Sequence, residues 1–492
     1  MNLSEISFDT GELQEKLAEL NPLKNNLYSI CDEITFGRLF ADSFRSIARY
    51  NSTSKCWYVY NGIIWEKDEA GVMVEKLAQR FSRGLRVFVD QNVGDEMTEA
   101  EKAYTSFVYR LGDRNKRVKM IKDAQALAFF NGNDLDAQSY LLNCRNVVLN
   151  LRTHEIMNHD PELLLSKVCN ADFNLSASSE IWERFIADVM QNNTEKIDYL
   201  RRIFGYGLTG ENPQEELYLC YGATTRNGKS TCLETVSNML GGYAMNLDPA
   251  SLALKPRDSR GASGDIARLK GCRFLHCSEP PKRMVLDVAM VKTLLGRDKI
   301  TARNLYEREI EFTPVFKLFI NSNYLPLVND DTVFSSGRIK VIEFNRHFKP
   351  EEQDKSLKDR LSSPESLSGV LNWCLSGLSD YQEIGTLPPD PVRYATEAYR
   401  AQSNKIGNFI DECMEEASGH AIQAKIAYEF YQKWCRSNGY GCENKSNFFT
   451  ELKNKNLLSE TGTVNGATVK NVIKGYYISP GISAELDGIS VY

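Results

Sequence analysis

A glycine-rich turn followed by a lysine and two hydroxyl residues is the clearest chemical signature in this sequence. The turn lies in YGATTRNGKST, residues 221–231, between a strand-like run, ELYLCY, and a helix-like stretch, STCLETVSNML. In such a turn backbone N–H groups point at phosphates, a lysine reaches the β and γ phosphates, and a serine hydroxyl ligates Mg²⁺. The pattern predicts a nucleoside triphosphatase with ATP and Mg²⁺ as cofactors. The residues predicted to bind the nucleotide are Gly222, Thr225, Asn227, Gly228, Lys229, Ser230 and Thr231.

The spacing of the glycines departs from the common form of this loop. That form has four residues between its first glycine and the Gly-Lys pair. Here five residues separate Gly222 from Gly228, and Ala223 stands where the first glycine is expected. We expect the extra residue to change the shape of the loop more than its binding of nucleotide. The alternative is a chance Gly-Lys-Ser sequence at a turn.

A second strand-like run, RFLHCSE, ends in a carboxylate. A phosphate loop needs an acidic partner on a neighbouring strand, which orients Mg²⁺ and polarises the attacking water. Glu279 is the only carboxylate in this run, because Ser278 occupies the place where many ATPases have Asp. We predict that Glu279 is the catalytic base and that it holds Mg²⁺ together with Ser230. The alternative is a surface glutamate after a strand.

Further polar residues follow the next two strand-like runs. The run FKLFINSN, residues 316–323, offers two amides, Asn321 and Asn323, that could hold the attacking water. Arg338 follows a Ser-Gly pair and precedes another strand, a place from which an arginine could reach a neighbouring subunit's nucleotide. A surface arginine is the alternative. The predicted catalytic residues are Lys229, Glu279, Asn323 and Arg338.

A predicted β-hairpin over residues 299–312 carries cations and an aromatic residue near its tip. Arg303 and Arg308 suit phosphates, and Tyr306 suits a stacked base, so the hairpin favours single-stranded nucleic acid. A structural hairpin with solvated charges is the alternative. Two other basic stretches, 110–122 and 255–273, are either solvated faces or parts of a DNA channel.

The elements that must position these residues suggest several domains. Asn61-Gly62 between apolar runs indicates a hairpin, and apolar residues at helical spacing predict helices over 70–92, 97–130 and 179–210. Residues 1 to about 35 are expected to form an amphipathic or loose lead-in. The expected parts are a mixed α+β module (1–165), a helical collar (166–214), an ATPase core (215–350), a helical segment (351–410) and a winged helix (411–492).

Composition and charge narrow the class of protein. The chain has 492 residues and a formal net charge of −6, which argues against a wholly basic nucleic-acid coat but not against a local basic channel. Its 12 cysteines include no C-x-x-C pair, so no zinc pattern is present. There is neither a long apolar run nor a signal-peptide pattern. We expect no membrane partner and a cytoplasmic location, for example in a bacterial host.

Together these motifs resemble the superfamily 3 helicases of phage and plasmid primase-helicase proteins, the group that includes the poxvirus-type helicase. The pieces that carry the resemblance are YGATTRNGKST, RFLHCSE, KTLLGRDKITAR, FKLFINSNYLP and SGRIKVIEF. The pieces around Arg49-Tyr50 and Trp57, and AYEFYQKWCRSNG, are similar to the family's flanking modules. The resemblance implies an α/β multidomain fold with an AAA+ type P-loop ATPase core, a mixed α+β N-terminal domain and a C-terminal winged helix.

The resemblance also implies a function. We expect an ATP-dependent DNA helicase of a phage, plasmid or other mobile element that forms a hexameric ring and unwinds duplex during replication initiation. The hairpin would line the pore and contact single-stranded or forked DNA, and Arg338 would act in trans on a neighbouring subunit's nucleotide. Only about 35 residues precede the first module, too few for a primase fold, so a separate primase or initiator is an expected partner. The alternatives are an ATP-switched origin-binding or loading factor that does not unwind, and an AAA+ remodeller that does not act on DNA.

Overall fold

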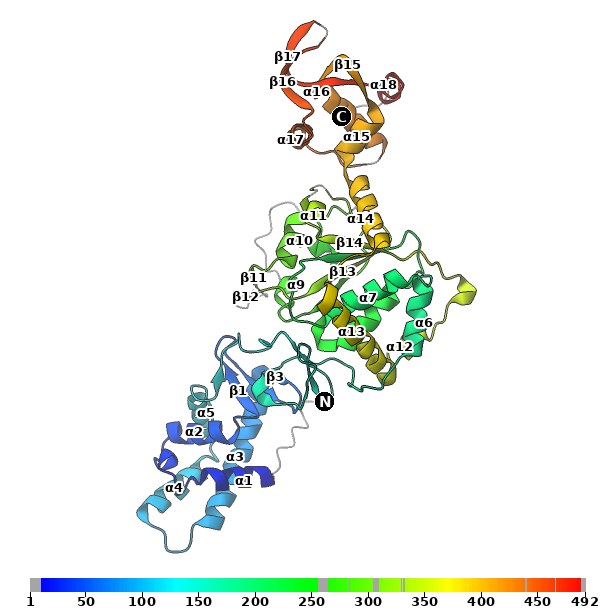
Figure 1. Ribbon diagram of the computed structural model, residues 1–492. Helices are drawn as coiled ribbons and strands as arrows, with labels where there is room; N and C mark the ends of the chain where they lie inside the picture. Colours follow the sequence, from blue (N-terminus) through cyan, green and yellow to red (C-terminus); the bar gives the residue numbers. More distant parts are fainter. Residues whose placement is uncertain are drawn as a thin grey trace.

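The computed structural model describes residues 10–254, 264–282, 284–303, 309–328, 330, 332–438, 440–464 and 466–487. Figure 1 shows three parts: a blue N-terminal part, a green central part, and an orange-to-red C-terminal part that is joined to the centre through α14. The mixed α/β, multidomain architecture expected from the sequence is confirmed, and its central sheet is parallel. Across the described residues, no helix is both long and apolar enough to cross a bilayer.

The N-terminal part packs five helices against a four-stranded sheet of order β3-β2-β1-β4. The Asn61-Gly62 turn joins antiparallel β2 and β3, as predicted. The helix expected over 97–130 is instead two helices and a short strand, because Asp113 caps a new helix after Gly112. The helices are α1 (Thr10–Leu20), α2 (Glu33–Ser43), α3 (Val72–Asn92), α4 (Glu99–Arg110) and α5 (Arg114–Ala124); the strands are β1 (Ala48–Asn51), β2 (Cys56–Tyr60), β3 (Trp65–Lys67) and β4 (Phe129–Phe130).

Of the two expectations for the start of the chain, an amphipathic or a loose lead-in, the described residues from Thr10 onward favour the amphipathic one. Helix α1 buries Leu13 and Leu17 in the same hydrophobic core as α2 and α3. A second small sheet follows the helices, with order β5-β6-β7. Its strands are β5 (Leu141–Asn143), β6 (Val148–Asn150) and β7 (Ile156–Met157), and β5 pairs antiparallel with β6.

The central part contains a five-stranded, wholly parallel sheet of order β14-β8-β13-β10-β9. Its strands are short apolar runs, as expected when both faces of a parallel sheet are covered. They are β8 (Leu217–Tyr221), β9 (Ala244–Leu247), β10 (Phe274–Cys277), β13 (Lys317–Ser322) and β14 (Ile339–Glu343). The chain leaves β8 toward β9 and leaves β13 in the opposite direction toward β14, so the topological switch point lies between β8 and β13. In open α/β sheets the crevice at the carboxyl ends of the strands at such a point is where ligands bind.

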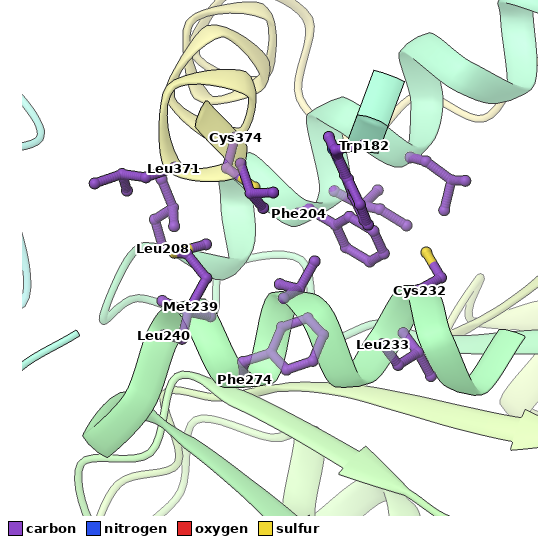
Figure 2. Close-up of a cluster of buried hydrophobic side chains, with 14 of the residues drawn as sticks. Trp182, Phe204, Leu208, Cys232, Leu233, Met239, Leu240, Phe274, Leu371 and Cys374 are labelled. Carbon is purple, nitrogen blue, oxygen red and sulfur yellow. The ribbon is translucent and has the colours of Figure 1, made fainter. Parts of the chain in front are cut away.

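Helices cover both faces of this sheet. One face packs against α6 (Glu180–Val189), α7 (Thr194–Gly207), α8 (Lys229–Leu240) and α13 (Pro364–Ile384), and Figure 2 shows Trp182, Phe204, Leu371 and Cys374 from three of these helices gathered around α8. The other face packs against α9 (Gly264–Ala267), α10 (Val288–Leu295), α11 (Thr332–Ser335) and α14 (Asp390–Ser403). The stretch 179–210 is helical as predicted; α6 and α7 are separated at residues 190–193, where Gln191 and Asn192 adopt positive φ.

Two buried cations tie the amino end of the sheet to the rest of the chain. Arg273, just before β10, donates to the carbonyls of Leu208 and Leu141, at 2.7 and 2.6 Å. Lys317, the first residue of β13, donates to the carbonyl and hydroxyl oxygens of Thr209. Burial lowers the pKa of Lys317 well below its ordinary value. The small β5-β6-β7 sheet and the end of α7 are therefore fixed to the central sheet.

The remaining elements connect and follow the central sheet. Strands β11 (Ile300–Ala302) and β12 (Ile310–Phe312) form the antiparallel hairpin expected from the sequence. A short α12 (Leu357–Leu361) precedes α13. The C-terminal part has a three-stranded sheet of order β15-β17-β16. It comprises α15 (Lys405–Cys413), β15 (Met414–Gln423), α16 (Ala424–Ser437), α17 (Lys445–Asn454), β16 (Leu458–Val464), β17 (Ala467–Ile478) and α18 (Pro480–Asp487).

Close packing of α7 on α13 generates a stability prediction. A Cβ atom on Gly377 would lie 1.9 Å from the carbonyl oxygen of Arg201, so the two helices meet backbone to backbone. We expect Gly377→Ala to lower the free energy of unfolding by about 3 kcal/mol or more, because the backbones must separate. Gly94→Ala is the control, since a Cβ there meets nothing within 4 Å. Thermal unfolding checks this; equal melting temperatures for both variants would contradict the backbone contact.

Candidate functional site

The predicted phosphate loop connects β8 to α8 and closes through a side chain. A Cβ atom on Gly222 would lie 2.1 Å from Asn227 Nδ2 and 2.7 Å from the Phe344 carbonyl, so only glycine fits there. Asn227 Nδ2 donates to the carbonyl of Thr224, at 2.7 Å. Arg226 has a positive φ of 57° and Gly228 one of 82°. The longer loop is thus accommodated by one left-handed residue and by the asparagine amide that folds back across it.

The first turn of α8 lies against the crevice between β8 and β13. Lys229 is the first residue of α8, with Gly228 as its N-cap. The N–H groups of a first helical turn have no partner within the helix and attract anions. A Cβ atom on Gly228 would lie 2.5 Å from Val189 Cγ2, which shows how closely α6 packs against the loop. The loop is therefore held between α6 and the sheet.

Lys229 is a buried cation in contact with three neutral oxygens. Its side chain is 3% exposed. Nζ donates to Asn227 Oδ1 at 2.7 Å, to Asn323 Oδ1 at 2.8 Å and to the Gly222 carbonyl at 3.4 Å. Burial lowers the pKa of Lys229 to about 8, while nearby Cys220 and Glu279 act in the opposite direction. A lysine has three N–H donors, so each is directed at an oxygen.

Asn323 links the lysine to the predicted base. Its Oδ1 accepts from Lys229, and its Nδ2 donates to Glu279 Oε1. The three residues come from α8, from the end of β13 and from the end of β10. A cation, an amide and a carboxylate therefore stand in a row at the carboxyl edge of the sheet. Such a row can hold a terminal phosphate at one end and a water molecule at the other.

The other predicted polar residues of this edge form a separate contact. Asn321 Nδ2 donates to Ser230 Oγ at 2.8 Å. Ser278 Oγ donates instead to Asn246 Oδ1 on β9, at 3.3 Å. Within the described ranges, no group of three His, Cys, Asp or Glu side chains could hold a metal by itself. The hydroxyl of Ser230 and the carboxylate of Glu279 still fit Mg²⁺, which prefers oxygen ligands and usually keeps several waters and phosphates in its shell.

Arg338 lies at the amino ends of the strands, whereas the phosphate loop lies at their carboxyl ends. It precedes β14, and its carbonyl accepts from the N–H of Leu217 at the start of β8. The length of β8 therefore separates it from Gly222, a distance of roughly 16 Å at ~3.3 Å per strand residue. Its guanidinium forms an ion pair with Glu215, and its side chain is 22% exposed. Within one chain, Arg338 is not brought together with Lys229, Asn323 and Glu279.

The predicted DNA-binding residues are only partly described. Arg303 directly follows β11. Tyr306 and Arg308 lie outside the described residues, as do residues 255–263 of the basic stretch 255–273. In the other basic stretch, Lys116 pairs with Glu33 at 2.6 Å and Arg114 pairs with Glu75 at 3.2 Å. These pairs favour the interpretation of 110–122 as a mostly solvated, structural face.

A segment after β14 borders the loop, and the sequence did not single it out. The Phe348 N–H donates to the Arg226 carbonyl at 2.9 Å, and His347 Nδ1 lies 2.8 Å from the Thr225 carbonyl. Arg346 pairs with Asp188, at 3.2 Å, at the end of α6. The available signal was a cluster of polar residues at the carboxyl end of a parallel strand, the same signal that identified Glu279 and Asn323.

Family models and curated relatives match most of this architecture. Residues 37–191 match the family described as "D5 N terminal like", residues 401–475 match "Poxvirus D5 protein-like", and residues 220–338 match a family of unknown function. The chain is 23% identical over 448 residues to "Putative helicase L207/L206" of Acanthamoeba polyphaga mimivirus, covering 83% of this chain and 46% of that protein.

Two further relatives carry helicase and primase names. "Putative helicase 022R" of Frog virus 3 (isolate Goorha) is 25% identical over 273 residues, covering 52% of this chain and 28% of that protein. "Putative primase C962R" of African swine fever virus (isolate Warthog/Namibia/Wart80/1980) is 21% identical over 333 residues, covering 62% and 34%. The chain thus spans less than half of the length of these relatives. Among solved structures, the NrS-1 C-terminal region has a TM-score of 0.47 and 10% identity, covering 87% of this chain and 96% of that one.

The environment of Lys229 generates a titration prediction. Burial stabilises the neutral amine, so Lys229 should lose its proton near pH 8 in the nucleotide-free protein. The charge of Glu279 raises the pKa of Lys229, so Glu279→Gln should move the midpoint to lower pH. Carbon-13 NMR of reductively methylated lysines measures both midpoints. Glu460→Gln, on exposed β16, is the control and should leave the midpoint in place. A midpoint that does not change in Glu279→Gln would show that the two side chains do not interact.

Proposed function

The chain belongs to the D5-like primase-helicase family, and from this premise we propose that it is an ATP-dependent DNA helicase. The observation that carries the proposal is the convergence of Lys229, Asn323 and Glu279 beside the first turn of α8. A cation, an amide and a carboxylate in this order suit the γ phosphate, the attacking water and the proton that this water loses. Mg²⁺, held by Ser230 and Glu279, would neutralise charge on the phosphates.

The sheet order supports an AAA+ type core. Strand β13 lies between β8, which precedes the phosphate loop, and β10, which precedes Glu279. Asn323 at the end of β13 consequently stands between the lysine and the base. The relatives named as helicases and primases suggest a role in replication. We propose that this chain unwinds duplex DNA during replication initiation on a phage, plasmid or other mobile element.

The position of Arg338 supports a shared site in a ring. At roughly 16 Å from its own loop, an arginine side chain does not reach the phosphates of its own chain. Its partly exposed guanidinium is instead available to a neighbouring subunit, as an arginine finger in trans. We propose a homo-oligomeric ring, hexameric in line with the family resemblance, in which each nucleotide lies between two subunits.

Two elements would contact DNA. The β11–β12 hairpin, with Arg303 beside it and Tyr306 and Arg308 in its tip sequence, would line the pore and hold a single strand. In the C-terminal part, α17 and the β16–β17 hairpin would form a winged helix for duplex DNA. The exposed residues of α17 include Lys445, Thr450 and Lys453, side chains that suit phosphates and base edges.

The first test of this function is hydrolysis and strand displacement. Lys229→Ala removes the cation at the phosphates, so nucleotide binding or turnover should fall. Glu279→Gln keeps the shape of the base but not its basicity, so it should bind ATP and hydrolyse it ~10²-fold more slowly or worse. Phosphate release and displacement on a forked DNA, with each tail polarity, measure both steps.

The outcomes of this test separate the candidate functions. Hydrolysis at the wild-type rate by both variants would refute the site. Wild-type protein that hydrolyses ATP with single-strand stimulation but displaces no strand on either fork would favour the origin-binding or loading factor. Hydrolysis that DNA does not affect would favour a remodeller of another substrate.

The second test concerns the shared site. Arg338→Ala should bind ATP normally and hydrolyse it poorly, because the arginine acts on a neighbour. Mixing it with Glu279→Gln should restore part of the activity, since some interfaces then pair an intact Glu279 with an intact Arg338. Arg360→Ala, which removes an exposed arginine paired with Asp354, is the matched control and should hydrolyse normally. Absence of rescue in verified mixed rings would place Arg338 in cis.

A further inference from the structure

A hydrogen bond joins the first turn of α8 to the strand beside it. Asn321 Nδ2 donates to Ser230 Oγ at 2.8 Å. Asn321 lies near the carboxyl end of β13, in register with Cys220 on β8. Phe319, two residues earlier and therefore on the same face of the strand, packs in the cluster that contains α8. The amide is thus aimed at the helix by the alternation of the strand itself.

The residue on the next strand does not make this contact. Cys277 pairs with Ile320, so Ser278 lies beside Asn321 but one strand farther from β8 and the loop that follows it. In many P-loop ATPases an Asp on a neighbouring strand holds Mg²⁺ together with the loop hydroxyl. Here Ser278 bonds to Asn246, on the side away from Ser230. Among the described residues, Asn321 supplies the side-chain hydrogen bond to Ser230 Oγ.

We propose that Asn321 positions Ser230, the predicted Mg²⁺ ligand; this inference rests on the proposed function. Asn321 would thereby perform part of the task of the Asp that many P-loop ATPases have where this chain has Ser278. A hydroxyl has one proton and two lone pairs. The Asn321 amide occupies one lone pair, which fixes the rotation of the hydroxyl and leaves the other lone pair available to the cation. Hydrogen-bond partners of this kind orient metal ligands, and their loss costs about 10–100-fold in metal affinity or activity.

Asn321, near the end of β13, and Asn323, just after it, therefore have different roles. Asn323 contacts Lys229 and Glu279, the groups for the γ phosphate and the water. Asn321 contacts Ser230, the predicted metal ligand. Loss of Asn323 should slow hydrolysis without changing the concentration of Mg²⁺ that the protein needs. Loss of Asn321 should change that concentration first.

The experiment measures binding of a fluorescent ATP analogue (mant-ATP) to the full chain, in EDTA and across a Mg²⁺ titration. Asn321→Leu keeps the approximate shape of the side chain but not its hydrogen bond. We expect its affinity in EDTA to equal that of wild type, and its half-saturating Mg²⁺ to rise about 10–100-fold. Electron paramagnetic resonance of Mn²⁺ in the complex with ADP gives a direct second measure of metal affinity.

Two variants sharpen this comparison. Asn321→Asp should restore or lower the half-saturating Mg²⁺, because a carboxylate accepts the Ser230 proton and adds negative charge at the metal. Ser278→Ala is the matched control on the neighbouring strand and should titrate as wild type does, because its hydroxyl bonds away from α8.

Each outcome decides between the proposals. Wild type that binds no mant-ATP would refute the proposed function itself. Wild type that binds with Mg²⁺, beside an Asn321→Leu variant with the same half-saturation, would overturn the role of Asn321 alone. If Asn321→Leu loses the same affinity for mant-ATP with and without Mg²⁺, Asn321 maintains the shape of the loop instead. That result would also overturn its proposed role at the metal. If the Leu variant does not fold, an Asn321→Asp variant whose half-saturating Mg²⁺ is higher than that of wild type is the overturning result.

Discussion

The ammonium group of Lys229 is a charge buried away from water, and hydrogen bonds to the surrounding residues offset the cost of its burial. An unpaired buried charge costs several kcal/mol, so each N–H must find an oxygen. Asn227, Asn323 and the Gly222 carbonyl supply them. All three are neutral, which is why burial still lowers the pKa of Lys229 to about 8. A phosphate in the loop would offer Lys229 charged oxygens in place of neutral ones, so the buried ammonium favours an anion.

The contacts of Lys229 depend on how the strands and helices of the central part are packed. Gly222 lacks a Cβ because Asn227 and the chain after β14 occupy that space. Asn323 can bridge to Glu279 only because β13 lies between β8 and β10 and all three strands end at one edge. The helices over the sheet must also approach closely, as the contact of Gly377 with the backbone of α7 shows. A loop of a few residues thus depends on packing throughout the central part.

The sequence predicted the residues of the site better than their contacts. Lys229, Glu279 and Asn323 follow apolar runs, and the carboxyl ends of parallel strands meet at one edge, so their proximity was foreseeable. That Asn227 closes the longer loop was not, because it depends on one left-handed residue, Arg226. The choice between two asparagines was left open, since which partner each meets depends on strand register and helix position.

Boundaries were less predictable where a few residues decide them. The helical stretch expected over 179–210 did not show where α6 would end, and two consecutive positive φ values, at Gln191 and Asn192, end it. The first 35 residues were predicted only as an amphipathic or loose lead-in, and α1 is fixed there by burial of Leu13 and Leu17 under α3. Strand β15 was missed because only its pairing with β17 distinguishes it from the helices around it. In each case tertiary contacts override the local pattern.

The ion pairs of Glu215, at the amino ends of the strands, affect whether Arg338 can turn toward a neighbouring chain. Glu215 faces two cations, since Arg297 also approaches it, at 3.4 Å. If Arg338 turns toward the phosphates of a neighbour, Arg297 remains to pair with the carboxylate, so no acid is left alone. A partly exposed ion pair is worth only about 0–1 kcal/mol, whereas charge-assisted bonds from arginine to phosphate are stronger and often bidentate. In the proposed ring this exchange would favour the nucleotide, and Glu215 would hold Arg338 in place until the nucleotide of a neighbouring subunit approaches.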